Sequence, residues 1–336
     1  MKWSWAIGGC FVGAMTFCPV ALAVSSAELY TATSYPYGRF EARARLATGD
    51  GVVSSFFLWK DGSERAGTFW NELDYEKVAA ECRLETNPIY GNPATNHSQR
   101  HPLGLDLCGA FHSYVFDWTP EALVWLVDGM EIRRETGATA QAFADNAAGQ
   151  GMQIHINLWP GDASFGGNFS PAILPVHQYV DWVQFSTYEN GQLKLAWRED
   201  FDGGSLPAGW LTGNWGSPKK LSTHAIENVN FIDGYAVLSL TADDARGPAG
   251  AMPSPGGAGE GSSAAGSAAT AGSNGSAGSG GSAGSAGRGG GPSAGAAPGA
   301  AIDTGACSFG RAPRGKGSLG AVGLAALAWL LRRRRG

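Results

Sequence analysis

The sequence predicts an all-β domain, built as a sandwich of two antiparallel sheets. Apolar and polar residues alternate along many short runs, Gly-containing turns separate these runs, and no long stretch shows the 3.6-residue period of a helix. The chain also carries 12 Trp, 15 Phe and 9 Tyr, which suit a sandwich core and rings that stack on sugars. Of the 336 residues, we assign 24–246 to this single domain.

Strands follow one another along the domain. In residues 38–47, GRFEARARLA, small or apolar side chains alternate with charged ones, so one face of this strand is buried. A more apolar strand follows in residues 51–62, and residues 111–135 supply two or three more with a tight Asp-Gly turn. Residues 138–150 are at most a short helix or a loop. The remaining strands are expected in residues 179–189, 191–201 and 234–244.

Both ends of the chain differ from the domain in composition. Residues 1–23 contain Lys2, an apolar run and a small-x-small site at Ala21-Leu22-Ala23, which predicts a signal peptide and export; a membrane anchor is the alternative. Residues 247–305 are rich in Gly, Ser and Ala and predict a flexible linker.

The C-terminal segment, residues 306–336, combines one Cys, an apolar run and four arginines. The apolar run is shorter than the ~20 residues of a standard membrane span. The segment resembles a myxobacterial C-terminal sorting signal, in which Cys307 is the site of processing or lipid attachment. We therefore expect the protein at the cell surface or outer membrane, or released outside the cell, with a plain membrane anchor as the alternative.

Charge and cysteine content restrict the partners. The formal net charge is -5, and basic residues cluster only at the extreme C-terminus, so we expect no nucleic-acid partner. Export would permit a disulfide between Cys82 and Cys108, although two buried free thiols are an equally good reading. No spacing of Cys or His residues indicates a zinc site. We also expect the protein to be a monomer.

The stretch FWNELDYEKV, residues 69–78, places Glu72, Asp74 and Glu76 at alternate positions of a strand, so all three face one way together with Trp70. Like charges on one face repel, which calls for a functional reason. Glycoside hydrolysis needs two carboxyl groups, one protonated and one ionised. Glu72 and Glu76 can supply them, with Asp74 as the neighbour that sets their proton affinities. A solvated acidic face and a calcium-binding cluster are the alternatives.

A second strand, GMQIHINLWPG at residues 151–161, has one continuous apolar face. Its other face carries His155, Asn157 and Trp159, and a large ring among polar groups on a wet face is typical of a binding surface. The alternative is a Trp covered by a loop. No second His stands at ligand spacing, so no metal is assigned to His155.

These residues resemble glycoside hydrolase family 16, whose signature is a Glu-x-Asp-x-Glu strand, matched here by ELDYE. Segments such as YGRFEARARLATGDGVVSSFFLW and INLWPG are similar to those of bacterial lichenases in this family. The resemblance implies a β-jelly-roll with a concave substrate cleft. Residues 196–217 and 231–244 resemble the family's N-terminal strands but come last here, so the domain is expected to be circularly permuted.

Residue by residue, the resemblance implies a retaining mechanism in which Glu72 is the nucleophile, Glu76 the acid/base and Asp74 their assistant. Glu85 stands where a permuted member of the family has Gln, which leaves affinity or pH optimum open. The substrate contacts it implies are Phe57, Trp59, Trp70, Asn87, Asn157, Trp159 and Trp215. It also implies a structural calcium ion held by Asp181, Asp200 and the Gly234 carbonyl, and no cofactor for catalysis.

The expected function is hydrolysis of β-1,4 bonds inside mixed-linkage β-1,3-1,4-glucan, with retention. Activity on β-1,3-glucan or xyloglucan is one alternative, because the catalytic strand would look the same. A non-catalytic glycan-binding module is another, but binding alone does not need adjacent like charges.

Overall fold

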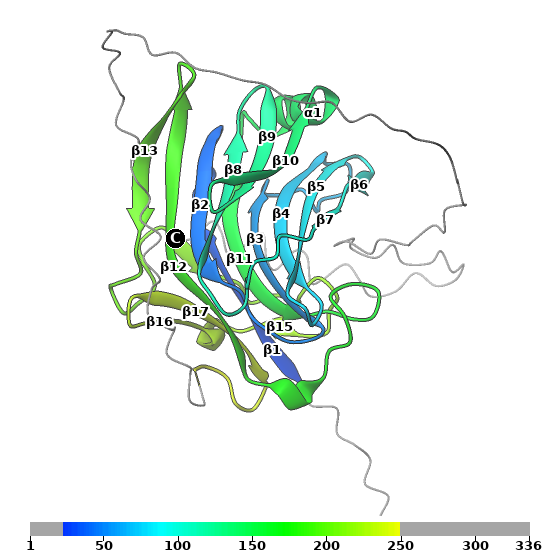
Figure 1. The fold of residues 1–336 in the computed structure, drawn as a ribbon, viewed down its shortest axis with the longest axis vertical. Coiled ribbons are helices and arrows are strands. Elements are labelled where there is room, and N and C mark those ends of the chain that lie inside the picture. Colours follow the sequence, from blue (N-terminus) through cyan, green and yellow to red (C-terminus); the bar gives the residue numbers. More distant parts are fainter. Residues whose placement is uncertain (1–22, 249–336) are drawn as a thin grey trace, which may run out of the picture. The chain divides into compact units, whose positions relative to one another are not determined.

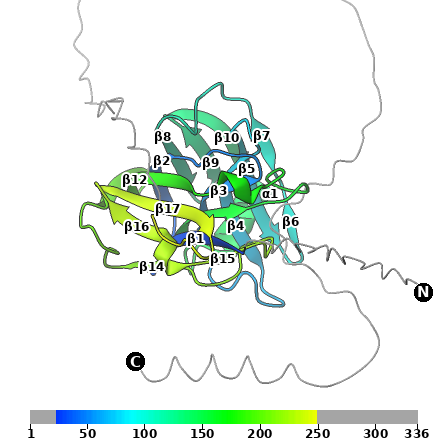
Figure 2. The same ribbon diagram turned by 90° about the horizontal axis from the view of Figure 1, so that it is seen from below.

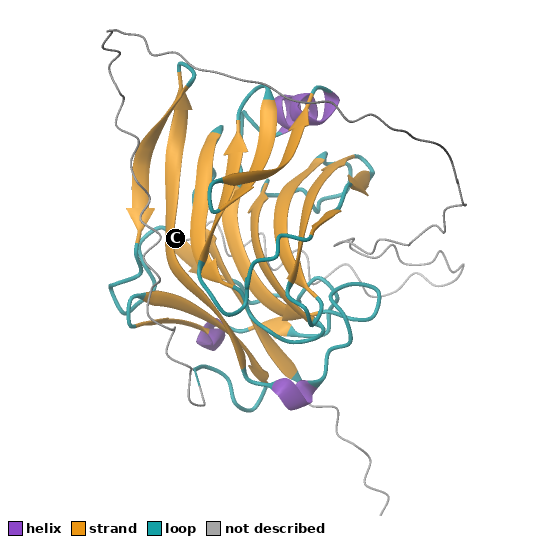
Figure 3. Cartoon of the chain, in the orientation of Figure 1, coloured by secondary structure: helices purple, strands orange, loops and turns teal. Residues whose placement is uncertain are grey.

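The structure, a computed structural model, describes residues 23–248. Strands make up most of this region (Figure 3), so the predicted all-β fold is confirmed. The predicted signal peptide, sorting segment and almost all of the linker lie outside the described residues and stay predictions. Among residues 23–248, no helix is long and apolar enough to cross a membrane.

One sheet carries the acidic strand, and we call it the acidic sheet (Figure 1). Its neighbouring strands pair antiparallel, in the order β1, β11, β3, β4 and β5. The bounds are β1 Val24–Thr31, β11 Gln153–Pro160, β3 Val52–Trp59, β4 Trp70–Val78 and β5 Arg83–Gly91. Short strands extend its edges, namely β6 Ala94–Asn96, β7 Gln99–His101 and β14 Trp210–Thr212.

The second sheet is built around β12, a strand of 14 residues. β12 pairs with β2 along one edge, and with β17 and then β13 along the other. Beyond β2 the sheet continues through β8, β9 and β10, and β16 pairs with β17. The bounds are β2 Gly38–Arg45, β8 His112–Trp118, β9 Ala122–Val127, β10 Met130–Thr136, β12 Val176–Glu189, β13 Gln192–Glu199, β16 Val229–Ile232 and β17 Tyr235–Ala242.

Few other elements are present in the described part of the chain. A short strand, β15, runs parallel to the start of β1. Helix α1 falls inside the stretch expected to be a short helix or a loop. The bounds are β15 Thr223–His224, α1 Ala138–Asn146, η1 Pro171–Ile173 and η2 Ile226–Asn228.

The core lies between the two sheets. Phe56 of β3 packs against Phe116 of β8, with ring centroids 5.1 Å apart. The Tyr75 hydroxyl donates to the carbonyls of Val115 and Leu126, at 2.8 and 2.9 Å. The predicted apolar face of β11 is also in this core, since Met152, Ile154, Ile156 and Leu158 are each at most 1% exposed.

The two ends of the domain meet. Figure 2 shows β17 lying between β12 and β1, and Val24 and Ser25 pair with Ala242 and Thr241. The Asp243 amide donates to the Ala23 carbonyl at 2.8 Å.

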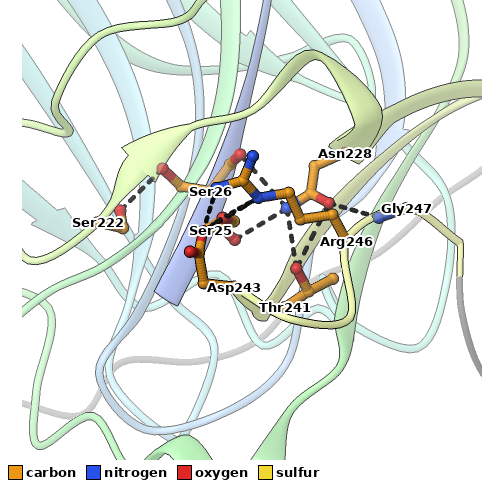
Figure 4. Close-up of polar contacts among 8 residues, drawn as sticks. All are labelled: Ser25, Ser26, Ser222, Asn228, Thr241, Asp243, Arg246 and Gly247. Carbon is orange, nitrogen blue, oxygen red and sulfur yellow. Dashed lines mark hydrogen bonds and ion pairs between the residues drawn. The ribbon is translucent and has the colours of Figure 1, made fainter. Parts of the chain in front are cut away.

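A polar network around Asn228 holds this junction (Figure 4). The Asn228 side-chain amide donates to the Ser25 carbonyl and the Thr241 hydroxyl, and its oxygen accepts from the Gly247 amide. Residues on both sides of the junction therefore share one set of hydrogen bonds.

Cys82 and Cys108 form a disulfide, with their Cα atoms 6.2 Å apart. It joins the turn between β4 and β5 to the segment before β8. Of the two readings left open by the sequence, the disulfide is the one found.

Candidate active site

Glu72, Asp74 and Glu76 lie on one face of β4, opposite the core-facing Leu73 and Tyr75, as the alternation predicts. The alternative of a solvated acidic face does not hold, since the three acids are only 5%, 3% and 4% exposed. The reason is their central place: β3 and β5 flank β4 on both sides, and bulky side chains from β3 stand beside the carboxyls.

Glu72 accepts a hydrogen bond from the Trp70 indole, with Nε1 and Oε2 2.8 Å apart. Burial raises the pKa of Glu72 to about 7, from a usual 4.5. Hydrogen bonds from Trp70 and Asp74 act in the opposite direction, because they stabilise the ionised form. Glu72 therefore sits where a small change in its surroundings decides whether it is ionised at neutral pH.

Asp74 is the group that keeps its proton. Burial, the charges of Glu72 and Glu76, and the hydrogen bond to Glu72 all raise the pKa of Asp74 well above its usual 3.8. A protonated Asp74 donates to Glu72, so Glu72 as a carboxylate has two donors, one on each side along the strand. The assisting role expected for Asp74 stays a prediction.

Several buried polar atoms on the same face have no hydrogen-bond partner among the described residues. Asn87 lies directly opposite Asp74 on β5, and its Nδ2 is such an atom, while its Oδ1 accepts from the His97 amide. Further examples are Ser55 Oγ, His155 Nε2 and Asn157 Oδ1. Native proteins rarely leave such atoms unsatisfied, so these atoms are available to bind water or a polar ligand.

The predicted aromatic contacts divide into two groups. Phe57 and Trp70, 8% and 9% exposed, stand against the acids and offer no open ring face. Trp59 packs edge-on against Trp70 at 4.9 Å and is half-buried. Trp215 is 43% exposed and meets the Tyr30 ring edge-on at 5.5 Å. Trp59 and Trp215 therefore have ring surface that a sugar could reach.

The prediction that Trp159 stacks on a sugar is wrong for this arrangement. Its ring is 1% exposed and lies nearly parallel to that of Phe165, with centroids 5.9 Å apart. The loop after β11 brings Phe165 over the indole, which is the alternative that the sequence left open.

The model of the family described as Glycosyl hydrolases family 16 matches residues 16–199, more than half of the chain. The chain belongs to glycosyl hydrolases family 16. The match includes β1 to β13 and all three acids, whereas β14 to β17 lie after it.

Two relatives of the chain are named β-glucanases. A β-glucanase of Fibrobacter succinogenes is 34% identical over 230 residues, 65% of this chain and 64% of that protein. A β-glucanase of Bacillus amyloliquefaciens is 34% identical over 154 residues, 45% of this chain and 60% of that protein. The chain therefore spans less than two thirds of the length of either relative.

Among solved structures, a Bacillus licheniformis β-glucanase is 25% identical, with a TM-score of 0.40 over 49% of this chain and 78% of that one.

Glu28 and His224, two residues beside the acids, were not found from the sequence of this family 16 domain. Glu28 on β1 lies opposite Asn157, with Oε1 2.8 Å from His155 Nδ1 and Oε2 3.0 Å from His224 Nε2. Burial would raise the pKa of Glu28, but the hydrogen bonds and charges of His155 and His224 outweigh it and lower the pKa to about 2. No local pattern points to this cluster, because Glu28 and His155 are 127 residues apart in sequence.

The residues expected to hold calcium do not fit a cation as they are arranged. The Asp181 carboxylate forms an ion pair with Arg43, and the Asp200 carboxylate lies 2.6 Å from the Arg198 guanidinium. An arginine therefore already neutralises each carboxylate. The described residues contain no group of three or more His, Cys, Asp or Glu side chains placed to hold a metal, and Gly234 adds only its carbonyl. The calcium ion stays a prediction.

Proposed function

We propose that this chain is an endo-acting glycoside hydrolase that cleaves β-1,4 bonds in mixed-linkage β-1,3-1,4-glucan, with retention of configuration. The observation that carries the proposal is the pair of donors on Glu72. Trp70 and a protonated Asp74 both stabilise its carboxylate, although burial alone would keep it protonated.

In this mechanism Glu72 attacks the anomeric carbon, and Glu76 gives its proton to the departing glycosidic oxygen. A glycosyl ester on Glu72 results. Glu76 then removes a proton from water, which attacks the same carbon and releases Glu72. Asp74 keeps its proton throughout and donates to Glu72, so that the negative charge is held on the attacking group.

The substrate class is supported by the family and by the acidic face. The similar proteins from Fibrobacter and Bacillus are β-glucanases by name. The unpartnered atoms of Asn87, Asn157 and His155 are suited to sugar hydroxyls, and Trp59 and Trp215 leave ring surface for stacking.

We also propose that the domain is a circular permutant of the family 16 fold. The family match stops at residue 199, yet β17 pairs with both β12 and β1 and its end lies against Ala23. The Fibrobacter relative aligns over 230 residues, a longer stretch than the family match. Export and surface attachment remain part of the proposal on the strength of the terminal segments alone.

The test is release of reducing sugar from barley β-glucan, laminarin and xyloglucan by the wild-type chain and by Glu72→Gln. We expect activity on barley β-glucan, and at least a 10³-fold loss in Glu72→Gln, on the order of that seen when catalytic nucleophiles are removed. Glu131→Gln, a change in an exposed ion pair on β10, is the matched control and should leave activity unchanged.

The possible outcomes distinguish the proposed function from its alternatives. Activity confined to laminarin or xyloglucan would reject the linkage preference but keep the mechanism. Binding of glucan without hydrolysis would indicate a glycan-binding module. Equal activity in Glu72→Gln would remove the proposed nucleophile, and an α-configured first product, detected by NMR, would reject retention.

A further inference from the structure

A fourth carboxylate stands beside the three acids. Glu85 on β5 lies directly opposite Glu76 in the ladder between β4 and β5. Directly opposed residues project from the same face, with Cβ atoms about 4.5–5.5 Å apart. Both residues are buried, with Glu85 as a whole 6% and Glu76 4% exposed. Two glutamates in this position repel each other unless a cation compensates one of them.

Two arginines compensate Glu85. Arg100 lies opposite Glu85 on β7, and its Nε donates to Glu85 Oε1 at 2.9 Å. Arg83 Nε lies 3.5 Å from the same oxygen but also binds Glu81 at 2.7 Å. The Arg100 side chain is 58% exposed and that of Glu85 only 8%, so the ion pair joins the buried acidic face to solvent.

Glu76 shares its face of β4 with the two other acids, and the charge of Glu72 changes near neutral pH. Asp74 is the next residue on the same face of β4 and keeps its proton. From β3, the neutral Ser55 lies opposite Glu76, and Asn157 follows on β11. Lys77 projects to the other side of β4, where its ammonium group donates to the carbonyls of Gly49 and Val52.

We propose that Glu85 and Arg100 together set the pH at which Glu76 loses its proton. This inference rests on the proposed function, in which Glu76 is the acid/base. A negative charge on Glu85 favours the protonated form of Glu76, and the guanidinium of Arg100 opposes it. In this scheme Glu85 acts through Glu76, so it is a positioning residue.

The test compares two variants of the full chain whose effects must be opposite. In Glu85→Gln the arginines are left uncompensated, so the alkaline limb of kcat/KM on barley β-glucan should move to lower pH. In Arg100→Gln the Glu85 charge is left less compensated, so the same limb should move to higher pH. We expect each shift to be about 0.5 to 1 pH unit at low ionic strength and smaller in 0.5 M salt, because Arg100 is exposed.

The control is Glu131→Gln, which removes one partner of an exposed ion pair on β10 and should leave the limb in place. The double variant Glu85→Gln with Arg100→Gln should return the limb toward its wild-type position. Shifts in the same direction, or no shift in an active enzyme, would overturn the inference.

A second readout does not depend on turnover. Titration of the Glu76 carboxyl carbon by NMR should show the same opposite displacements in the two variants. If no glucan is hydrolysed, the proposed function fails, but the titration still decides whether Glu85 and Arg100 control the Glu76 proton. Equal titration in wild type and both variants would reject that control.

Discussion

At the scale of single residues, the proposed mechanism depends on how the Glu72 carboxylate is kept ionised in a buried place. Burial favours the protonated form of Glu72, and its pKa is raised to about 7. Without the donors from Trp70 and Asp74 the carboxylate would be protonated at neutral pH, and a protonated Glu72 cannot attack the anomeric carbon. In the proposed mechanism, the hydrogen bonds from Trp70 and Asp74 to Glu72 therefore decide the pH range of activity.

Replacing Trp70 by Phe tests this balance. The variant loses a donor to the ionised form, so the pKa of Glu72 should rise further and the acidic limb of kcat/KM should move to higher pH, by about one unit for a hydrogen bond to a charged group. Activity at pH 6 should fall more than activity at pH 8. The pH dependence of kcat/KM on barley β-glucan measures the shift.

The matched control is Trp59→Phe, because Trp59 contacts Trp70 and shares its side of the sheet but has no hydrogen bond to Glu72. This variant should change KM without moving the acidic limb. A limb that stays in place in Trp70→Phe, or moves to lower pH, would contradict the role given to the indole.

At the scale of elements, the β4–β5 hairpin positions the acids, and a disulfide restrains its turn. Ala79 and Cys82 in this turn have φ values of 62° and 51°, in the left-handed region that non-glycine residues avoid. The bond from Cys82 to Cys108 reduces the freedom of this turn in the unfolded chain as well as in the folded one. The disulfide therefore restrains the turn in which Ala79 and Cys82 have this unfavourable backbone conformation.

Removing the disulfide should lower stability and leave the chemistry in place. For a separation of 26 residues, the loop-closure relation predicts that Cys82→Ala with Cys108→Ala lowers the free energy of unfolding by about 3.5 kcal/mol. Urea unfolding followed by fluorescence measures this change, and kcat/KM at 25 °C should stay close to that of the wild type.

Wild-type protein treated with a reductant provides the control and should unfold at the same urea concentration as the double variant. Equal midpoints in the oxidised wild type and the variant would show that the disulfide does not stabilise the domain. A large loss of activity in the folded variant would mean that it positions the acids directly.

At the scale of the whole domain, the last strand of the described residues, β17, is an internal part of the structure. β17 pairs with β12 of the second sheet and with β1, which continues into the acidic sheet, and Leu238 and Leu240 are fully buried. A chain ending at residue 199 would expose these edges and lose this part of the core. Residues 200–246 are therefore needed for folding even though the family match ends before them.

A rearranged chain tests the proposed permutation. Placing residues 200–246 before residue 24, with a short Gly-Ser connection, should give a folded and active enzyme, because the Asp243 amide already lies 2.8 Å from the Ala23 carbonyl. Residues 24–199 alone should be unfolded. Circular dichroism and activity on barley β-glucan measure both outcomes.

The new break in the rearranged chain falls between β13 and the loop before β14, outside any strand. A rearranged chain that fails to fold would contradict the view that the junction at Ala23 and Asp243 is a natural place to connect the domain. A folded and active 24–199 fragment would show that β14 to β17 are dispensable.

By itself, the sequence determined the sheet architecture, the shared face of Glu72, Asp74 and Glu76, and the apolar face of β11. These features follow from alternation along single strands, which is a local property of the chain. The tertiary structure decided that the acids are buried, that Phe165 covers Trp159, that Glu28 lies between two histidines, and that Arg100 compensates Glu85. Each of these depends on which segments the fold brings together, and solvent exposure and electrostatics cannot be read from the order of residues along one strand.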